Sequence, residues 1–242
     1  MIISLMYHDV YSTSPSESGL ASDLYKIKIE EFEEQIIRLK KIEEKTPGSI
    51  ILTFDDGGSS FYTPISHILD KYNLKGYFFV ATKYINSPGF LTDEQIVNLD
   101  KRGHVVGSHS HSHPENLSTF SIEEIQNEWS SSLSILERIL KHKVTVASIP
   151  NGYQSKNVLE SARIANITTL FTSKPTTKEV NYKGMKLIGR YVVLNDMSTD
   201  EVLSFVFSRN KRALLWGKWL TLNVVKLFLG NKYEIVKQKV FK

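Results

Sequence analysis

Short apolar, β-branched segments alternate along this chain with longer segments in which apolar residues recur every three or four positions. The first pattern is typical of buried strands and the second of amphipathic helices. The predicted strands are 2–8, 49–54, 75–81, 104–108, 144–148, 168–172 and 186–194. The predicted helices are 30–44, 62–72, 92–102, 121–141 and 156–165. Such alternation predicts a parallel sheet in an α/β barrel of about seven units, fewer than a full eight.

The composition fits a folded domain with a sizeable core. The chain has 242 residues, of which 41% are hydrophobic and 23% charged, and this balance excludes a disordered chain. It has no cysteine, so neither a disulfide framework nor a thiolate metal site can form. Residues 1–10 lack the basic and long apolar regions of a secretory signal, and we expect a cytoplasmic location.

The net charge of +4 conceals a basic C-terminal extension. Residues 209–242 contain nine Lys or Arg residues and one acid, a net charge of 9 − 1 = +8, which leaves −4 for residues 1–208. We therefore divide the chain into a domain, 1–208, and an extension, 209–242. Leucines and tryptophans lie between the charged residues of the extension. Because of these apolar residues, we do not infer nucleic-acid binding from the positive charge. Two interpretations remain: a helix in peripheral contact with a membrane, or a terminal helix packed on the barrel or on a second subunit.

Two polar motifs follow predicted strands. Thr-Phe-Asp-Asp-Gly occupies 53–57, and Gly-Ser-His-Ser-His-Ser-His occupies 107–113. Because the carboxyl ends of parallel strands meet at one rim, these side chains should converge. Two imidazoles and one carboxylate suit zinc or a related divalent ion with an open position for water, and the second carboxylate could act as general base. The alternative is that Asp55-Asp56-Gly57 is only a turn.

The histidine motif leaves the choice of ligands open. His109 and His113 would share one face of a helix or tight turn, whereas an extended segment would place His109, His111 and His113 on one side.

These motifs resemble the polysaccharide deacetylases of carbohydrate esterase family 4, which contain the NodB homology domain. The resemblance extends from about Ile29 to Ile188 and includes 69–80 and 113–117. It implies the family's distorted, incomplete (β/α)7 barrel. It also implies a bound divalent ion, for which Zn²⁺ is preferred and Co²⁺, Ni²⁺ and Mn²⁺ are the alternatives. The general base would be Asp55, and the metal ligands would be Asp56, His109 and His113, which leaves His111 as a solvated or supporting residue.

A turn with the sequence Pro150-Asn151-Gly152 follows the predicted strand 144–148. The resemblance implies that the backbone N–H near Asn151 faces the oxyanion of the reaction, although the turn could be purely structural. Many family members place an arginine two residues before this proline, where it pairs with the base. Ser148 stands there in this chain. Arg190 could supply that charge from a later strand, or it could be a lone surface arginine.

Family members often place a catalytic histidine near the end of the domain, but no histidine follows His142 in this chain. The strand ending in His8 resembles a branch of the family in which that motif is permuted to the N-terminus. This implies that His8 protonates the leaving amine. A buried histidine at a strand end, without a catalytic role, is the alternative.

The resemblance implies a metal-dependent N-deacetylase that acts on an N-acetylated sugar or glycan precursor and releases acetate and a free amine. Two other classes share parts of the pattern. One is a metal-dependent amidohydrolase acting on a small non-sugar amide. The other is a catalytically silent carbohydrate-binding protein, which Ser148 and the displaced histidine would suit. The oligomeric state is not predicted.

Overall fold

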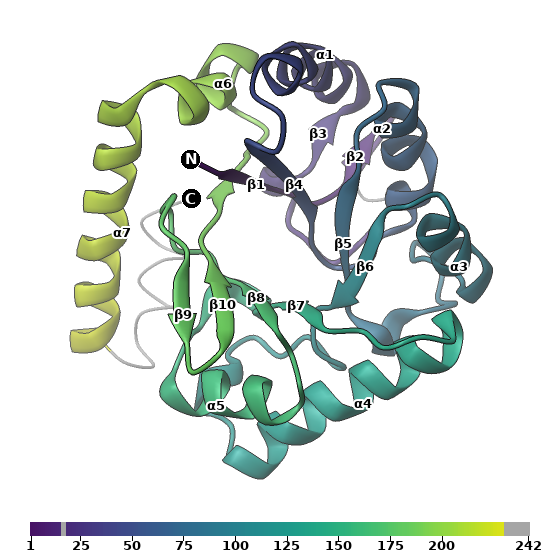
Figure 1. The fold of residues 1–242 in the computed structure, drawn as a ribbon, viewed down its shortest axis with the longest axis vertical. Coiled ribbons are helices and arrows are strands. Elements are labelled where there is room, and N and C mark those ends of the chain that lie inside the picture. Colours follow the sequence, from purple (N-terminus) through teal and green to yellow (C-terminus); the bar gives the residue numbers. More distant parts are fainter. Residues whose placement is uncertain (16–17, 230–242) are drawn as a thin grey trace.

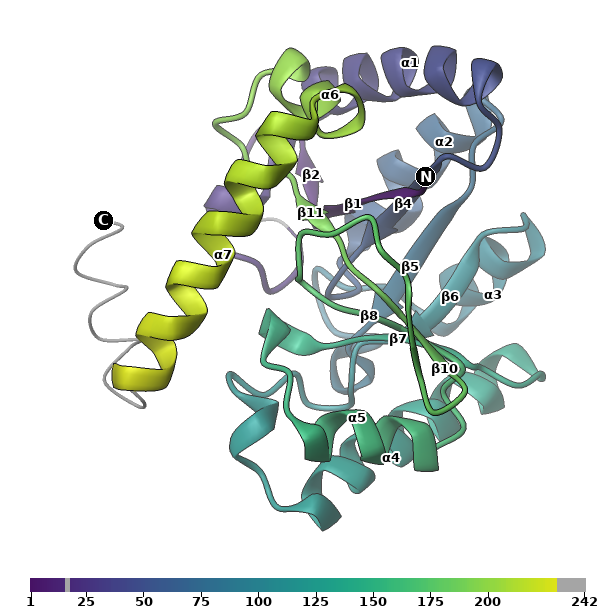
Figure 2. The same ribbon diagram turned by 60° about the vertical axis from the view of Figure 1, so that its left-hand side comes forward.

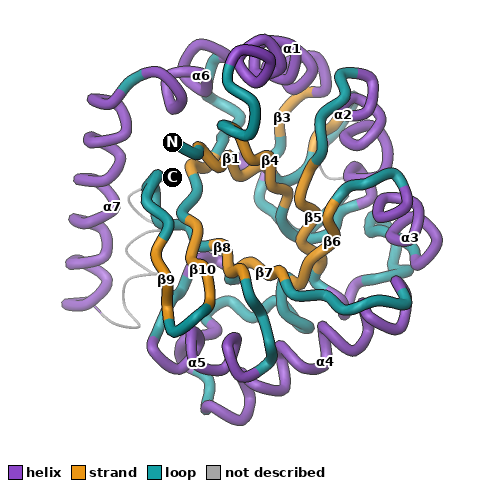
Figure 3. The backbone as a smooth tube through the Cα atoms, viewed as in Figure 1, coloured by secondary structure: helices purple, strands orange, loops and turns teal. Residues whose placement is uncertain are grey.

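Nine strands form one curled sheet around the centre of the molecule, and the helices lie outside it (Figures 1 and 3). The computed structural model describes residues 1–15 and 18–229, with side chains described as far as Leu222. The strand order is β11 (Tyr191–Val192), β1 (Ile3–Tyr7), β4 (Ile50–Phe54), β5 (Gly76–Val80), β6 (Val105–Ser108), β7 (Val146–Ser148), β8 (Thr169–Phe171), β10 (Met185–Ile188) and β9 (Val180–Tyr182). A separate small sheet pairs β2 (Val10–Tyr11) with β3 (Ile27–Lys28).

Each neighbouring pair from β11 to β10 is parallel, and β9 runs antiparallel to β10. The carboxyl ends of the parallel strands therefore point to one rim. β11 and β9 are the two ends of the hydrogen-bonded order, so the barrel is incomplete. The predicted fold class, a distorted and incomplete α/β barrel, is confirmed.

The helices cover the outer surface of the sheet (Figure 3). They are α1 (Ile29–Lys45), α2 (His67–Lys71), α3 (Asp93–Lys101), α4 (Ile122–Leu140), α5 (Lys156–Ile164), α6 (Thr199–Phe207) and α7 (Arg209–Leu229). α3, α4 and α6 each begin with a capping box, in which a Ser or Thr side chain and a Gln or Glu three residues later satisfy each other's backbone N–H groups.

Aromatic side chains fill the core beneath the first strands. The Phe54 ring stacks between those of Tyr7 and Phe78, at centroid distances of 5.6 and 4.9 Å, and Phe32 of α1 packs edge-on against it. These rings are almost fully buried. The packing fixes β1, β4 and β5 side by side and so fixes the positions of the residues that follow them.

Two predicted elements differ from the structure, and one helix was not predicted. The strand predicted at 186–194 is divided, because Gly189 and Arg190 leave the sheet and separate β10 from β11. A Cβ at Gly189 would lie 2.3 Å from the carbonyl oxygen of Lys174, so this crossing requires glycine. The helix predicted at 62–72 begins with a wide turn, because Thr63, which precedes a proline, is extended. Helix α6 was not predicted.

Helix α7 forms the described part of the extension, and residues 230–242 lie outside the described residues. The proposed boundary at residue 208 stays a prediction. Within the described part of the chain, none of the helices has the length and apolar character needed to cross a membrane.

Candidate metal centre

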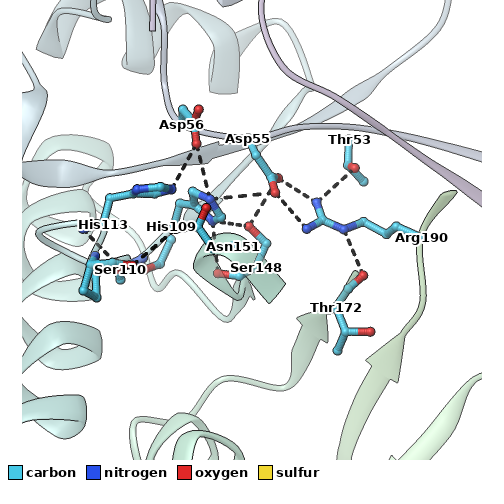
Figure 4. Close-up of polar contacts among 12 residues, drawn as sticks. Thr53, Asp55, Asp56, His109, Ser110, His113, Ser148, Asn151, Thr172 and Arg190 are labelled. Atoms are coloured by element: carbon cyan, nitrogen blue, oxygen red, sulfur yellow. Dashed lines mark hydrogen bonds and ion pairs between the residues drawn. The ribbon is translucent and has the colours of Figure 1, made fainter. Parts of the chain in front are cut away.

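Asp55 and Asp56 follow β4 directly but meet different partners (Figure 4). The Asp55 N–H donates to the Tyr7 carbonyl at 3.1 Å and continues the pairing of β4 with β1. Asp56 has a φ of 94°, a left-handed conformation that costs about 1–3 kcal/mol in a residue other than glycine. At this turn the Asp56 carboxylate faces His109 and His113, whereas that of Asp55 faces Arg190, with its Oδ2 also 3.8 Å from His109 Nε2.

The histidine motif folds into a turn after β6. The His109 N–H donates to the Val80 carbonyl at 2.9 Å, and positive φ angles at Ser110 (63°) and His113 (55°) reverse the chain. The rings of His109 and His113 then lie 5.0 Å apart. Asp56 Oδ1 is 3.5 Å from His109 Nε2 and 3.3 Å from His113 Nε2.

These three side chains fit a divalent cation. Their ligand atoms all lie within 4.8 Å of one another. Ligands about 2.1 Å from a tetrahedral zinc ion would be about 3.4 Å apart, close to the distances from Asp56 to the two imidazoles. Two imidazoles and a carboxylate are also a ligand set that zinc favours.

His111 lies outside this group. Its Nδ1 is 3.0 Å from the Thr82 hydroxyl, and its backbone N–H donates to Glu128 of α4 at 2.9 Å. The Glu128 carboxylate also accepts from the N–H and the hydroxyl of Ser112, at 2.8 and 2.7 Å. Sequence reasoning missed Glu128. The signal was present, because this acid occupies a position on the apolar face of α4 between Ile125 and Trp129 and is buried there.

Arg190 binds Asp55 through two hydrogen bonds. Its Nη1 donates to Oδ1 at 2.6 Å and its Nη2 to Oδ2 at 2.8 Å. Arg190 is only 1% exposed and also donates to the Thr172 carbonyl and the Thr53 hydroxyl, so it is not a surface arginine. The connection between β10 and β11, residues 189–190, places Arg190 beside Asp55.

Charge and burial set the pKa values of these groups. Burial favours the neutral forms of both carboxyl groups, yet Arg190 and His109 hold the pKa of Asp55 below its usual value. Hydrogen bonds from His109 and His113 hold the pKa of Asp56 well below its usual value despite burial. Burial alone would lower the pKa of His113, but Asp56 raises it. Both carboxyl groups are therefore ionised near neutral pH.

Ser148 connects the ion pair to the histidine turn. Its hydroxyl donates to Asp55 Oδ1 at 3.3 Å and lies 2.6 Å from His109 Nδ1. The Ser148 carbonyl is 3.2 Å from the same nitrogen. With a cation bound, a proton on His109 Nδ1 would satisfy these oxygen acceptors and leave the lone pair of Nε2, which lies 3.5 Å from Asp56 Oδ1, to face the ion.

The turn predicted after the strand at 144–148 is present as a short helical turn, Pro150–Gly152. Asn151 has a φ of 52°, and its side-chain amide donates to the Pro114 carbonyl at 3.3 Å. A Cβ at Gly152 would lie 2.6 Å from the Ser173 hydroxyl oxygen, which explains the need for glycine. An oxyanion role for the Asn151 N–H stays a prediction.

His8 follows β1 beside Asp55, since β1 and β4 pair in register at Tyr7 and Phe54. Its ring packs on Tyr25 with a centroid distance of 4.8 Å. Its buried Nδ1 has no hydrogen-bond partner among the described residues. Burial lowers the pKa of His8, although the carboxylates of Asp56 and Asp55 oppose this. The imidazole is therefore neutral near pH 7.

Asp9, which sequence reasoning did not assign to the site, connects two loops beside it. Its Oδ1 accepts hydrogen bonds from Ser18 and Ser60, both at 2.6 Å. A Cβ at Gly58 would lie 2.0 Å from that oxygen. Burial raises the pKa of Asp9 to about 6. The contacts hold the segment after His8 against the loop that follows Asp56.

Comparison with known proteins identifies related sequences and folds. A family model described as polysaccharide deacetylase matches residues 42–170. Putative polysaccharide deacetylase YxkH of Bacillus subtilis is 27% identical over 70% of this chain and 59% of its own length. Peptidoglycan-N-acetylglucosamine deacetylase PgdA of Listeria monocytogenes is 36% identical over 80% of this chain and 41% of its own length. The chain thus spans about half the length of these relatives.

A solved structure described as Streptococcus pyogenes deacetylase PplD in complex with acetate shares the fold. It superposes with a TM-score of 0.70 and 24% identity, over 84% of this chain and 97% of the other. A polysaccharide deacetylase from Bacillus cereus, BC0361, has a TM-score of 0.71 and 18% identity, over 85% of this chain and 68% of its own. These similarities establish the barrel type.

Proposed function

Because this chain belongs to the polysaccharide deacetylase family, we propose that it is a metal-dependent hydrolase that removes the acetyl group from an N-acetylated sugar. The products would be acetate and a free amine. One observation carries the proposal: a buried carboxylate, Asp55, is paired with Arg190 beside the cluster of Asp56, His109 and His113.

The cluster of Asp56, His109 and His113 would hold the divalent ion. Such an ion lowers the pKa of water and polarises a carbonyl oxygen. Asp55 would accept the proton of the attacking water, because Arg190 keeps its carboxylate ionised in a buried position. Ser148 would keep His109 in the tautomer that presents Nε2. The backbone N–H of Asn151 would stabilise the oxyanion.

His8 would donate a proton to the leaving nitrogen. Its pKa is lowered by burial, so the imidazole must gain a proton during turnover before it can donate one. Asp55, which would have accepted a proton from water, is next to the strand end that carries His8 and would supply this proton. Nδ1 of His8, which has no hydrogen-bond partner in the described part of the chain, is a position where such a proton can reside.

Substitution of the two adjacent acids tests the division of roles. We expect Asp55→Asn to lower kcat by about 10²–10⁴-fold while it retains bound zinc, because Asn cannot accept the proton. Asp56→Ala should lose the zinc itself. The exposed Asp196→Asn is the matched control. Acetate release and metal content are measured on the same preparations, and normal turnover by Asp55→Asn would refute the assignment.

A substrate panel tests the proposed substrate class. Acetate release from N-acetylglucosamine oligomers, with little release from simple acetamides, is the expected result. The opposite preference would indicate an amidohydrolase acting on small amides. Binding of the oligomers without acetate release, by protein loaded with metal, would indicate a carbohydrate-binding protein.

A further inference from the structure

Helix α7 follows α6 and runs along the side of the barrel (Figures 1 and 2). Leu215 packs against the hydrophobic core. Arg212 Nη1 donates to the carbonyls of Phe205 and Val206, both at 2.9 Å, and so satisfies the end of α6. These contacts fix the orientation of the helix.

The middle of α7 is attached to the segment that positions Arg190. The rings of Trp216 and Trp219 stack at 5.4 Å, and Lys174 Nζ lies over them at 4.8 and 5.5 Å from their centroids. Lys174 follows β8, and its carbonyl accepts the Arg190 N–H at 2.9 Å. The tryptophan pair therefore lies near the rim that carries the metal centre.

The outer face of α7 combines exposed leucines with a lysine. Leu214 is 55% exposed and Leu222 37% exposed, and the exposed Lys218 lies between them at helical spacing. Leu220 is 43% exposed on another side of the helix. Residues 209–222 contain four basic residues and no acid, and the sequence of 209–242 carries a net charge of +8.

We propose that α7 is an interfacial helix that docks this chain on an anionic lipid surface. The exposed leucines would bury apolar area at the headgroup boundary, while the ammonium group of Lys218 between them would meet lipid phosphates. Charge complementarity favours an anionic surface, and it opposes a dimer in which two copies of α7 pack together, because each segment 209–242 carries +8. The proposal does not depend on the catalytic assignment.

Vesicle sedimentation of the full chain tests this docking. We expect sedimentation with vesicles in which about a third of the lipid is phosphatidylglycerol, little with pure phosphatidylcholine, and weaker binding as salt rises.

One double variant and one single control variant distinguish a loss of docking from a loss of folding. Leu214→Glu with Leu222→Glu should weaken vesicle binding by at least about tenfold and leave the thermal midpoint unchanged, because both side chains are exposed. Ile164→Glu, at a residue 51% exposed on α5, is the matched control and should bind like wild type. Equal recovery in the soluble fraction with both kinds of vesicle would overturn the proposal. So would a dimer that the leucine substitutions dissociate in the absence of vesicle binding.

Discussion

At the residue scale, one guanidinium group determines the charge of the proposed base. Asp55 is buried, and a buried carboxyl group without a cationic partner would favour its neutral form. Arg190 supplies that partner through two hydrogen bonds, while position 148 carries a hydroxyl that bridges Asp55 and His109. The ion pair and the metal ligands thus form one connected polar network.

Removal of this guanidinium should move the pH dependence of turnover. Arg190→Gln removes the largest influence that offsets the burial of Asp55, so the pKa of Asp55 rises from its lowered value. Protonation then abolishes the base at a higher pH, and the acidic limb of kcat/KM against pH should shift upwards by at least about one pH unit. Arg163→Gln, an exposed arginine of α5, should leave the limb unchanged. An unmoved limb in Arg190→Gln would contradict the role of this ion pair.

At the element scale, α4 holds the histidine turn in place. The helix begins with the capping box of Ser121 and Glu124 and buries Trp129 fully, so its position against β6 is well fixed. Glu128 extends from the same face to accept three hydrogen bonds from His111 and Ser112. The carboxylate of one helix therefore sets the shape of a loop that carries two of the proposed ligands.

Substitution of Glu128 should weaken metal binding without removing a ligand. Glu128→Gln retains the size of the side chain but loses the charge that two backbone N–H groups bind. We expect metal affinity to fall by about 10–100-fold, as is usual for residues that orient ligands. Competitive titration with a chelating dye measures this. The exposed Glu123→Gln on the same helix is the control, and equal affinity of Glu128→Gln and wild type would refute the role.

At the scale of the whole molecule, the candidate site joins distant parts of the chain. Its residues follow β1, β4, β6 and β7 or lie between β10 and β11. A cation bound by Asp56, His109 and His113 would connect the ends of β4 and β6. Because such a site exists only in the folded chain, metal binding should stabilise the native state.

Thermal unfolding with and without metal measures this coupling. Free zinc at about 100 times its dissociation constant adds about 2.7 kcal/mol, which for a chain of this size raises the midpoint by about 5–10 °C. A chelator should reverse the shift. Asp56→Ala should unfold at the same temperature in either condition, and a zinc-dependent shift in that variant would show that the stabilising ion binds elsewhere.

The amino-acid sequence by itself determined the features that depend on local patterns. The spacing of apolar residues predicted the ends of α1 and α4 to within one residue of the observed ends. The ends of the strands before Asp55 and His109 were also predicted to within one residue. Strands that alternate with helices then require a parallel sheet, and a parallel sheet brings both motifs to one rim. This reasoning needs only hydrogen-bond geometry and the burial of apolar side chains.

Tertiary structure alone decided the contacts between distant residues. Arg190 and Asp55 are 135 positions apart, and their contact depends on the crossing at Gly189 where the sheet remains open. The grouping of His109 and His113 with Asp56, and the separate position of His111, depend on the left-handed turn that Glu128 supports. Local periodicity carries no information about such contacts, because they arise only when the curled sheet brings its strand ends and helices together.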